Sequence, residues 1–279
     1  MKPLVRPMNY RHAFHAGNFA DVFKHAVLIE LLCALRAKST PFCYFDTHAG
    51  RGCYDLAGEA ARKTDEAADG VLRLLDLASP PPALAAYVEQ VRAFANDSAA
   101  PDGRPYPGSP LLARQLLRDN DSAVLCELQE AEAQALHRLV HADKRFHVHR
   151  RDGYEALPAL LPPREKRGLV LIDPPFEAQA DEFRLIESAL EQAMARWPTG
   201  RYAVWYPIKR GADVQPFRRW LGNHAAGNSL VGEFFIHPDN SALRLNGCGM
   251  ALINPPWHME DKLAGILTAM RQCLRPEAF

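Results

Sequence analysis

The chain has 279 residues, 48% of them hydrophobic, and it carries 33 basic and 33 acidic residues. This is enough apolar material for one large α/β domain, alone or with a small insertion. The balanced charge excludes a chain-wide basic signal for nucleic acid, so a nucleic-acid surface has to come from local clusters.

The six cysteines form no Cys-x-x-Cys pair, which argues against a structural zinc site and favours reduced thiols in the cytosol. The apolar run at residues 26–35 is interrupted by Glu30 and is too short to span a bilayer. The first residues, Met1-Lys2-Pro3-Leu4, lack the apolar core of a signal peptide. We therefore expect a soluble cytoplasmic protein without a membrane association.

The predicted elements begin with a helix over Phe19–Lys38, whose start is indicated by Asn18 and Asp21, and a strand over Phe42–Phe45. From about residue 123, short apolar strands alternate with amphipathic helices, which is typical of an α/β protein with a doubly wound, mostly parallel sheet. The later predicted strands are Ala123–Leu128, Phe146–His149, Leu169–Ile172, Tyr202–Tyr206, Leu230–Ile236 and Met250–Ile253, and the helices are Glu130–His141, Tyr154–Leu161, Asp181–Trp197 and Met259–Leu274.

Residues 53–108 interrupt the alternation, because they are rich in Ala and helical in pattern, with proline-rich turns at 79–82 and 101–107. We predict a small inserted helical subdomain here, with residues 1–52 and 109–279 forming the main domain. Ser109 is expected to be the N-cap, and Pro110 the first residue, of a helix that covers Leu111–Arg118.

Asp46-Thr47-His48-Ala49-Gly50-Arg51-Gly52 follows the first predicted strand, and its glycines allow a tight turn and close approach of a ligand. Alone, this pattern fits an ordinary strand-to-helix turn equally well. It lacks the third glycine of the dinucleotide fingerprint, which disfavours an NAD-linked oxidoreductase.

Acidic residues lie at the carboxyl ends of the next three predicted strands: Glu127, Asp152 and Asp173, spaced 25 and 21 residues apart. Each spacing fits one helix-plus-strand unit, so the three carboxylates are expected at one edge of the sheet. An acid in the place of Glu127 accepts from ribose hydroxyls, and one in the place of Asp152 accepts from an adenine amino group. Each acid alone could be a helix cap or a solvated charge, but three in register favour a nucleoside site.

Asp173-Pro174-Pro175-Phe176 follows the fourth of these strands directly. Two prolines keep the backbone extended, so Asp173 and the Pro174 carbonyl can be aimed at an amino group while Phe176 stacks on a base. An aromatic amine is a poor nucleophile, and acceptors on its N–H groups together with in-line positioning favour its methylation. The alternative interpretation is a plain turn.

Asn254-Pro255-Pro256-Trp257 is a similar pattern, but it follows the last predicted strand. In element order it lies too far from the nucleoside acids, so we interpret it as structural, with Asn254 as a turn residue.

The histidines of the opening segment, His12, His15 and His25, raise the possibility of a metal site. No carboxylate or cysteine lies at ligand spacing, so the sequence disfavours it.

The chain resembles the bacterial 23S ribosomal RNA adenine-N6 methyltransferases of the RlmJ type over nearly its whole length. The resemblance is carried by the opening segment at residues 10–25, by Asp46-Thr47-His48-Ala49-Gly50, by Tyr106-Pro107-Gly108-Ser109-Pro110, by Asp173-Pro174-Pro175, by Tyr202-Ala203-x-Trp205-Tyr206-Pro207 and by Asn254-Pro255-Pro256-Trp257. Phe176 stands where the family often has Tyr, a change that preserves stacking.

The resemblance implies a class I (Rossmann-like) S-adenosylmethionine-dependent methyltransferase fold with an inserted helical subdomain, acting on one adenine of 23S ribosomal RNA. It implies that Asp173 is the catalytic acceptor, aided by Pro174 and Phe176, and that Tyr10 contacts the target nucleotide. It also implies a set of residues around S-adenosylmethionine: Lys24, His25, His48, Ser109, Glu127, Asp152, Gly153 and Asp173. We expect no metal, no obligate protein partner and a monomer.

Two stretches are locally basic: residues 1–52 and residues 201–220 each carry a net charge of +4. In the second, Tyr202, Trp205, Tyr206 and Trp220 are interleaved with the cations, as in surfaces that contact phosphates and stack on bases. A strand followed by a solvated amphipathic helix explains the same pattern equally well. A target adenine has to leave its stack to reach Asp173, so base flipping is expected.

Three alternatives stay open at this point. The protein could be another nucleic-acid amine methyltransferase, for guanine N2 of ribosomal RNA or for adenine N6 of DNA. It could also be a non-catalytic RNA-binding factor of ribosome assembly, or an NAD-linked oxidoreductase. Only the opening segment argues against the first, and the intact acids argue against the second.

Overall fold

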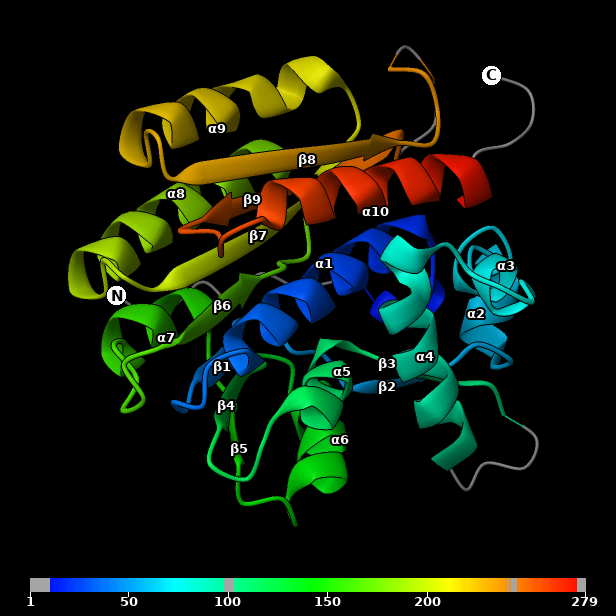
Figure 1. The fold of residues 1–279 in the computed structure, drawn as a ribbon, viewed down its shortest axis with the longest axis horizontal. Coiled ribbons are helices and arrows are strands. Elements are labelled where there is room, and N and C mark those ends of the chain that lie inside the picture. Colours follow the sequence, from blue (N-terminus) through cyan, green and yellow to red (C-terminus); the bar gives the residue numbers. More distant parts are fainter. Residues whose placement is uncertain (1–10, 98–102, 240, 242–244, 275–279) are drawn as a thin grey trace.

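The computed structural model describes residues 11–97, 103–239, 241 and 245–274. In this part of the chain, a seven-stranded sheet in the order β5-β4-β1-β6-β7-β9-β8 forms the centre of the molecule (Figure 1). Its strands are β1 (Cys43–Asp46), β4 (Ser122–Cys126), β5 (Phe146–His149), β6 (Gly168–Ile172), β7 (Arg201–Ile208), β8 (Ser229–Phe235) and β9 (Gly247–Ile253).

Five neighbouring strands, from β5 to β7, run parallel to one another, whereas β9 is antiparallel to both β7 and β8. This order, with a reversed strand inserted beside the last parallel one, is that of the class I methyltransferases. The predicted fold class is confirmed. Because β9 is reversed, its carboxyl end lies at the opposite edge of the sheet from those of the parallel strands.

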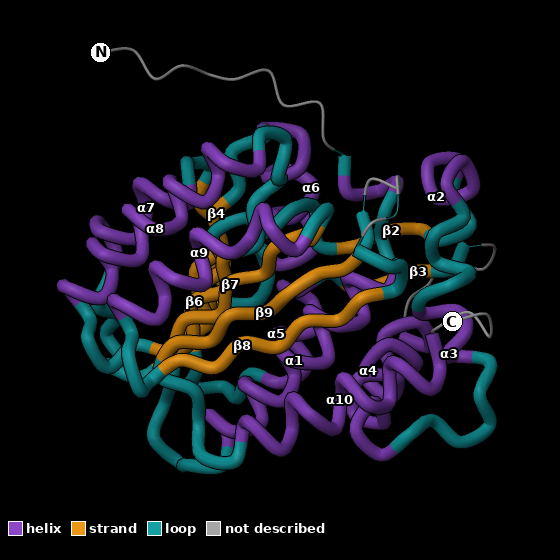
Figure 2. The backbone as a smooth tube through the Cα atoms, turned by 90° about the horizontal axis from the view of Figure 1, so that it is seen from above, coloured by secondary structure: helices purple, strands orange, loops and turns teal. Residues whose placement is uncertain are grey.

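Helices cover both faces of the sheet, α7, α8 and α9 on one side and α1, α4 and α10 on the other (Figure 2). The sequence of β6 explains the two layers: Leu169 and Leu171 belong to the apolar cluster of the α1 side, whereas Val170 and Ile172 belong to that of the α8 side. Parallel strands buried on both faces are continuously apolar for this reason. The helices are η1 (His12–Phe14), α1 (Phe19–Arg36), α5 (Ser109–Leu116), α6 (Glu130–Val140), α7 (Gly153–Leu160), α8 (Gln179–Arg196), α9 (Gly211–His224) and α10 (Met259–Leu274).

The stretch 53–108 is largely helical, with α2 (Glu59–Thr64), α3 (Val71–Leu75) and α4 (Pro82–Asp97), as its composition indicates. A two-stranded antiparallel ribbon, β2 (Cys53–Asp55) with β3 (Pro105–Pro107), closes its base, which we did not expect. Leu84, Tyr87 and Val88 of α4 are buried in the same cluster as α1 and α10. The division into a main domain and a subdomain at these boundaries stays a prediction.

The predicted strands of the sheet begin and end within three residues of those observed, and Phe146–His149 coincides with β5. Helix α9 corresponds to one of the two interpretations of the basic stretch 201–220, a strand followed by an amphipathic helix. Among the described residues, no helix combines the length and the apolar character needed to cross a membrane.

Candidate active site

The carboxyl ends of the parallel strands meet at one edge, as strand register requires. Asp46 pairs with Leu125 on β4 and with Leu171 on β6, and Ile172 pairs with Val204 on β7. The residues that follow β1, β4, β5 and β6 therefore lie side by side, which brings Glu127, Asp152 and Asp173 to the edge that the spacing predicted.

Asp46 is fully buried at the end of β1 and accepts hydrogen bonds from the hydroxyls of Tyr44 and Ser109, each at 2.7 Å. Burial raises its pKa to about 6, although both hydrogen bonds act to lower it. Ser109 is not the N-cap that we expected, because α5 begins at Ser109 and is preceded by Gly108 as its cap. That expectation was wrong: the buried carboxylate takes the hydroxyl that would otherwise cap the helix.

Glu127 holds the glycine turn after β1 in place. Its Oε2 accepts from the Gly50 amide at 2.9 Å and its Oε1 accepts from the Gln129 amide at 2.7 Å. Gly50 has a φ of 62°, and Gly52 one of 83°, so both need glycine's freedom. Burial raises the pKa of Glu127, and each carboxylate oxygen retains one lone pair for a further donor.

Asp152 is the N-cap of α7, and its Oδ1 accepts from the amides of Tyr154 at 2.7 Å and Glu155 at 3.3 Å. Gly153 begins the helix against the loop that follows β1. A Cβ at Gly153 would lie 2.1 Å from the Thr47 carbonyl oxygen, so the close approach of the two backbones requires glycine. The capping role that the sequence left open for Asp152 is therefore real, and it uses only Oδ1 of the carboxylate.

His48 lies near two of the strand-end acids, Asp152 and Asp173. Its Nδ1 lies 2.8 Å from the Thr47 hydroxyl, and its ring meets that of Tyr154 edge to face at 5.0 Å. Burial lowers the pKa of His48 to about 4, while the charges of Asp173 and Asp152 both act on it in the opposite direction. A neutral imidazole thus lies within electrostatic range of both strand-end carboxylates.

Asp173 forms an ion pair with Lys24 of α1, whose Nζ lies 2.6 Å from Asp173 Oδ2. Lys24 also pairs with Asp21, at 2.9 Å, and its side chain is 6% exposed. Burial alone lowers the pKa of Lys24, but the two carboxylates raise it well above its usual value. Asp21 is the residue that sequence reasoning missed here, because it was noted only as a helix-start signal.

Asp21 is buried, and its Oδ2 is 3.0 Å from His12 Nε2 and accepts from the Gly17 amide at 2.9 Å. Burial alone raises its pKa, but the charges of His12 and Lys24 lower it well below its usual value. A buried charge of this kind is stable only when it is paired and hydrogen-bonded. The opening segment thus supplies the chain of ion pairs that ends at Asp173, from His12 through Asp21 to Lys24.

Phe176 lies beside the acid and packs edge to face on Trp205 at 5.9 Å and on Phe183 at 5.4 Å. Pro174 is buried, which anchors the turn. Trp205 follows Val204, the β7 partner of Ile172, and Lys24 Nζ lies 5.9 Å from the centre of its ring. Trp205 therefore belongs to this site, although the sequence placed it in a basic surface.

His25 lies in the core, 1% exposed, with Nδ1 2.8 Å from the Tyr106 hydroxyl, which is itself 3.0 Å from that of Tyr87. Burial lowers its pKa to about 3. The part that the resemblance gives it in cofactor binding stays a prediction. Tyr10, the implied contact of the target nucleotide, lies outside the described residues.

Asn254 is a turn residue, as expected. Its φ is 55°, its Nδ2 donates to the carbonyls of Pro198 at 2.9 Å and Gly200 at 2.6 Å, and its Oδ1 accepts from Asn228. Ile253 pairs with Tyr202 at the start of β7, so the turn lies at the edge of the sheet opposite Asp173.

The stretch 201–220 is mostly not a base-stacking surface. Tyr202 and Tyr206 are buried, and the Tyr206 hydroxyl donates to Glu233 at 2.8 Å. Arg210 pairs with Asp213 at 3.0 Å. Lys209, however, directly follows β7 and so lies at the same edge as Asp173.

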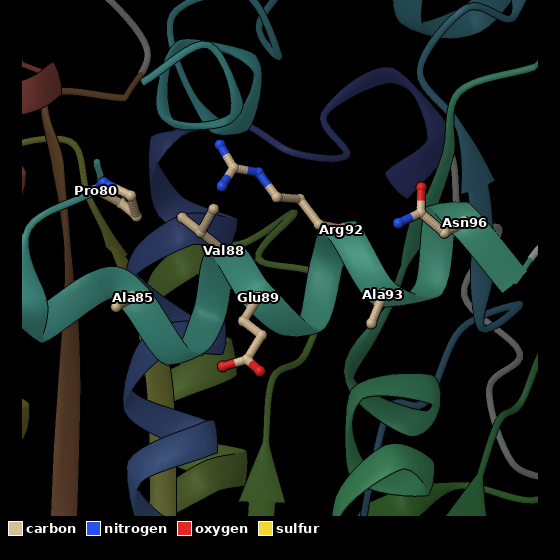
Figure 3. Close-up of a pocket in the computed structure, with 7 residues that line it drawn as sticks. All are labelled: Pro80, Ala85, Val88, Glu89, Arg92, Ala93 and Asn96. Atoms are coloured by element: carbon tan, nitrogen blue, oxygen red, sulfur yellow. The ribbon is translucent and has the colours of Figure 1, made fainter. Parts of the chain in front are cut away.

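Two further features lie apart from the strand ends. Among the described residues, no cluster of three or more His, Cys, Asp or Glu side chains is placed to bind a metal. An open groove of about 440 Å³ runs along α4 and is lined by Val88, Glu89 and Arg92, among others (Figure 3). Arg92 donates to the carbonyls of Leu75 and Leu77, so this groove is a feature of the insertion and contains no predicted site residue.

Comparison with known proteins agrees with this geometry. The family model described as Ribosomal RNA large subunit methyltransferase D, RlmJ, matches residues 39–278. The Ribosomal RNA large subunit methyltransferase J of Escherichia coli is 38% identical, over 96% of this chain and 95% of its own length. The protein of the same name from Haemophilus influenzae is 38% identical over 97% and 95%.

The crystal structure of a Legionella pneumophila protein has the same fold, with a TM-score of 0.83 at 35% identity over 94% of this chain and 95% of that one. The sequence matches and the fold agree over nearly the whole length. The chain belongs to the RlmJ family of ribosomal RNA large subunit methyltransferases.

Proposed function

We propose that this protein transfers a methyl group from S-adenosylmethionine to the exocyclic N6 of one adenine in 23S ribosomal RNA, in the cytoplasm. The observation that carries the proposal is the Asp173-Pro174-Pro175-Phe176 turn at the carboxyl end of β6, beside three further strand-end acids. Family membership supplies the substrate class, and the turn supplies an acceptor suited to an amine.

The residues present fit the cofactor. Glu127 is buried at the end of β4, where its free lone pairs suit two ribose hydroxyls, and the Oδ2 of Asp152 suits the adenine amino group. Lys24, His48, Ser109 and Gly153 would complete the cofactor site, with Asp46 hydrogen-bonded to the Ser109 hydroxyl. S-adenosylmethionine supplies an electrophilic methyl group when it is bound.

Asp173 acts by orientation. Lys24 engages its Oδ2, so Oδ1 is left to accept an N–H of the target amine together with the Pro174 carbonyl. Two acceptors on one amino group favour a pyramidal nitrogen whose lone pair is available for attack. Because Lys24 pairs with Oδ2, Oδ1 can accept a hydrogen bond throughout, and the amine loses its proton to solvent during or after transfer.

Phe176 and Trp205 offer the aromatic surfaces for a flipped base, and Tyr10 is proposed as a further contact of the target nucleotide. Lys209, at the same edge, suits an RNA phosphate. We propose that the enzyme acts as a monomer without an obligate protein partner.

The test is transfer of labelled methyl from S-adenosylmethionine to unmodified large-subunit ribosomal RNA, followed by nucleoside digestion and mass spectrometry. We expect N6-methyladenosine at one position with the wild type and none with Asp173→Ala. Label in methylguanosine, or label that Asp173→Ala leaves unchanged, contradicts the proposal.

A further inference from the structure

The insertion is tied to the segment before α1 by the carboxylate of Glu66, in the loop between α2 and α3. Its Oε1 lies 2.9 Å from His15 Nδ1, and its Oε2 accepts from Asn18 Nδ2 at 2.9 Å. The side chains of His15 and Glu66 are 38% and 36% exposed, so this pair can exchange protons with solvent. These three residues are called the Glu66 latch below.

The backbones on both sides of the latch fit closely. The Val71 amide donates to the Gly17 carbonyl at 2.8 Å, and the Thr64 hydroxyl donates to the Phe14 carbonyl. Gly17 has a φ of 79°, and a Cβ there would lie 2.7 Å from Val71 Cγ1. Figure 1 shows the start of α1 (darkest blue) beside the insertion (cyan). The insertion therefore shapes the turn that starts α1.

From that turn, contacts lead to the candidate site without a break. Asn18, which the latch holds, caps α1 by accepting from the amides of Ala20 and Asp21, each at 3.0 Å. The Gly17 amide donates to Asp21, Asp21 pairs with Lys24 at 2.9 Å, and Lys24 pairs with Asp173 at 2.6 Å. A displacement of the turn would thus move the cation that fixes Asp173.

We infer that Glu66 is a positioning residue for methyl transfer: through His15 and Asn18 it fixes the first turn of α1, and with it Asp21 and Lys24 beside Asp173. This inference rests on the proposed function. It gives the insertion a part in the reaction, although none of its described residues is among the predicted site residues.

The latch is sensitive to pH. The hydrogen bond to Glu66 raises the pKa of His15 above 6.5, against the effect of burial, and the charges of Glu66 and of Asp21 on α1 act in the same direction. The ionic part of the latch is therefore present below the raised pKa of His15 and is lost as pH rises through it. The Asn18 hydrogen bond persists at all these pH values.

The test compares Glu66→Ala and Glu66→Gln with the wild type, and uses Glu59→Gln as the matched control because Glu59 is 86% exposed and pairs only with Lys63 among described residues. We expect kcat to fall roughly 3- to 10-fold in Glu66→Ala, with KM for RNA unchanged. The ratio of wild-type to Glu66→Gln rates should be largest at low pH and shrink as His15 deprotonates. In the Glu66→Gln background, His15→Gln should lower kcat little further, since both substitutions remove the same His15–Glu66 interaction.

Hydrogen exchange at the amides of residues 17–24 gives a measurement that does not depend on activity. Exchange should become faster in Glu66→Ala and stay unchanged in Glu59→Gln. A folded Glu66→Ala protein with wild-type kcat, pH profile and exchange overturns the inference. If the wild type itself transfers no methyl group to RNA, the proposed function fails, and the exchange data still decide whether Glu66 holds the first turn of α1.

Discussion

The molecule contains two Pro-Pro turns of almost the same sequence, Asp173-Pro174-Pro175-Phe176 and Asn254-Pro255-Pro256-Trp257, and they differ in every respect that matters for chemistry. The first follows the parallel strand β6 and the second follows the antiparallel strand β9, so they lie at opposite edges of the sheet. Phe176 packs on Trp205, whereas Trp257 is 88% exposed. A short motif therefore acquires its meaning from the direction of the strand before it.

The polar groups of the two turns differ in the same way. Asp173 has Oδ2 paired with Lys24, and its Oδ1 has no hydrogen-bond partner among the residues that the structure describes. Asn254 uses its whole amide, because Nδ2 donates to two carbonyls and Oδ1 accepts from Asn228. A side chain that can bind a ligand keeps an acceptor or donor without a partner in the protein, whereas a structural turn residue uses all of them.

Asp173→Asn should have the largest effect on the reaction, because the neutral amide breaks the ion pair with Lys24. Either its single oxygen faces Lys24 and its NH2 group meets the amine, or the oxygen faces the amine and the NH2 group meets Lys24, so one of the two donors always lacks an acceptor. We expect kcat to fall on the order of 10²- to 10³-fold with cofactor binding preserved. Single-turnover transfer and calorimetry measure the two quantities. Asp181→Asn is the matched control, because the Asp181 side chain on α8 is 49% exposed and also pairs with a cation, Arg184. A rate within tenfold of the wild type would show that Asp173 is not the acceptor.

Asn254→Asp is the reciprocal exchange, and it should act on stability alone. Aspartate tolerates the positive φ, but its carboxylate faces the Pro198 and Gly200 carbonyls without a donor. We expect a loss of about 1–3 kcal/mol in the free energy of unfolding. Urea titration measures it, and Asn223→Asp, at an exposed position of α9, is the control. Reduced turnover per folded molecule would mean that the second turn takes part in catalysis.

Substitution of the aromatic residues of the two turns, Phe176 and Trp257, should have the smallest effects. Phe176→Leu should lower kcat/KM about 2- to 10-fold, because an aromatic contact contributes roughly 0.5–1.5 kcal/mol. Phe176→Tyr should retain the rate, and Trp257→Leu should change neither rate nor stability. Steady-state methyl transfer on one RNA substrate compares the three variants. Equal losses at Phe176 and Trp257 would remove the distinction between the turns.

Much of the fold follows from local pattern. Gly168–Ile172 is a continuously apolar strand, and Phe146–His149 alternates apolar residues with histidines. The acids that follow them fall at the carboxyl edge because parallel strands end together. Asn18 caps α1 as its residue type predicts. Such features depend on neighbours within a few residues, so one sequence suffices to predict them.

Other features depend on partners far along the chain. Lys24 and Asp173 are 149 residues apart, and no spacing rule connects them. Ser109 looked like a helix cap because nothing local reveals that Asp46 is buried beneath it. Tyr202 and Tyr206 looked like stacking residues among cations, yet strand alternation places them under α8 and α9. In each case tertiary contacts override a sound local preference.

Gly153 lies where the backbone at the start of α7 contacts the loop that follows β1. Any side chain there would meet the Thr47 carbonyl, since even a Cβ would come within 2.1 Å of its oxygen. The first turn of α7 therefore rests directly on the loop of β1, and Asp152 and His48 keep a fixed separation. The missing Cβ therefore sets the distance between the loop after β1 and the start of α7, because the two backbones are in direct contact.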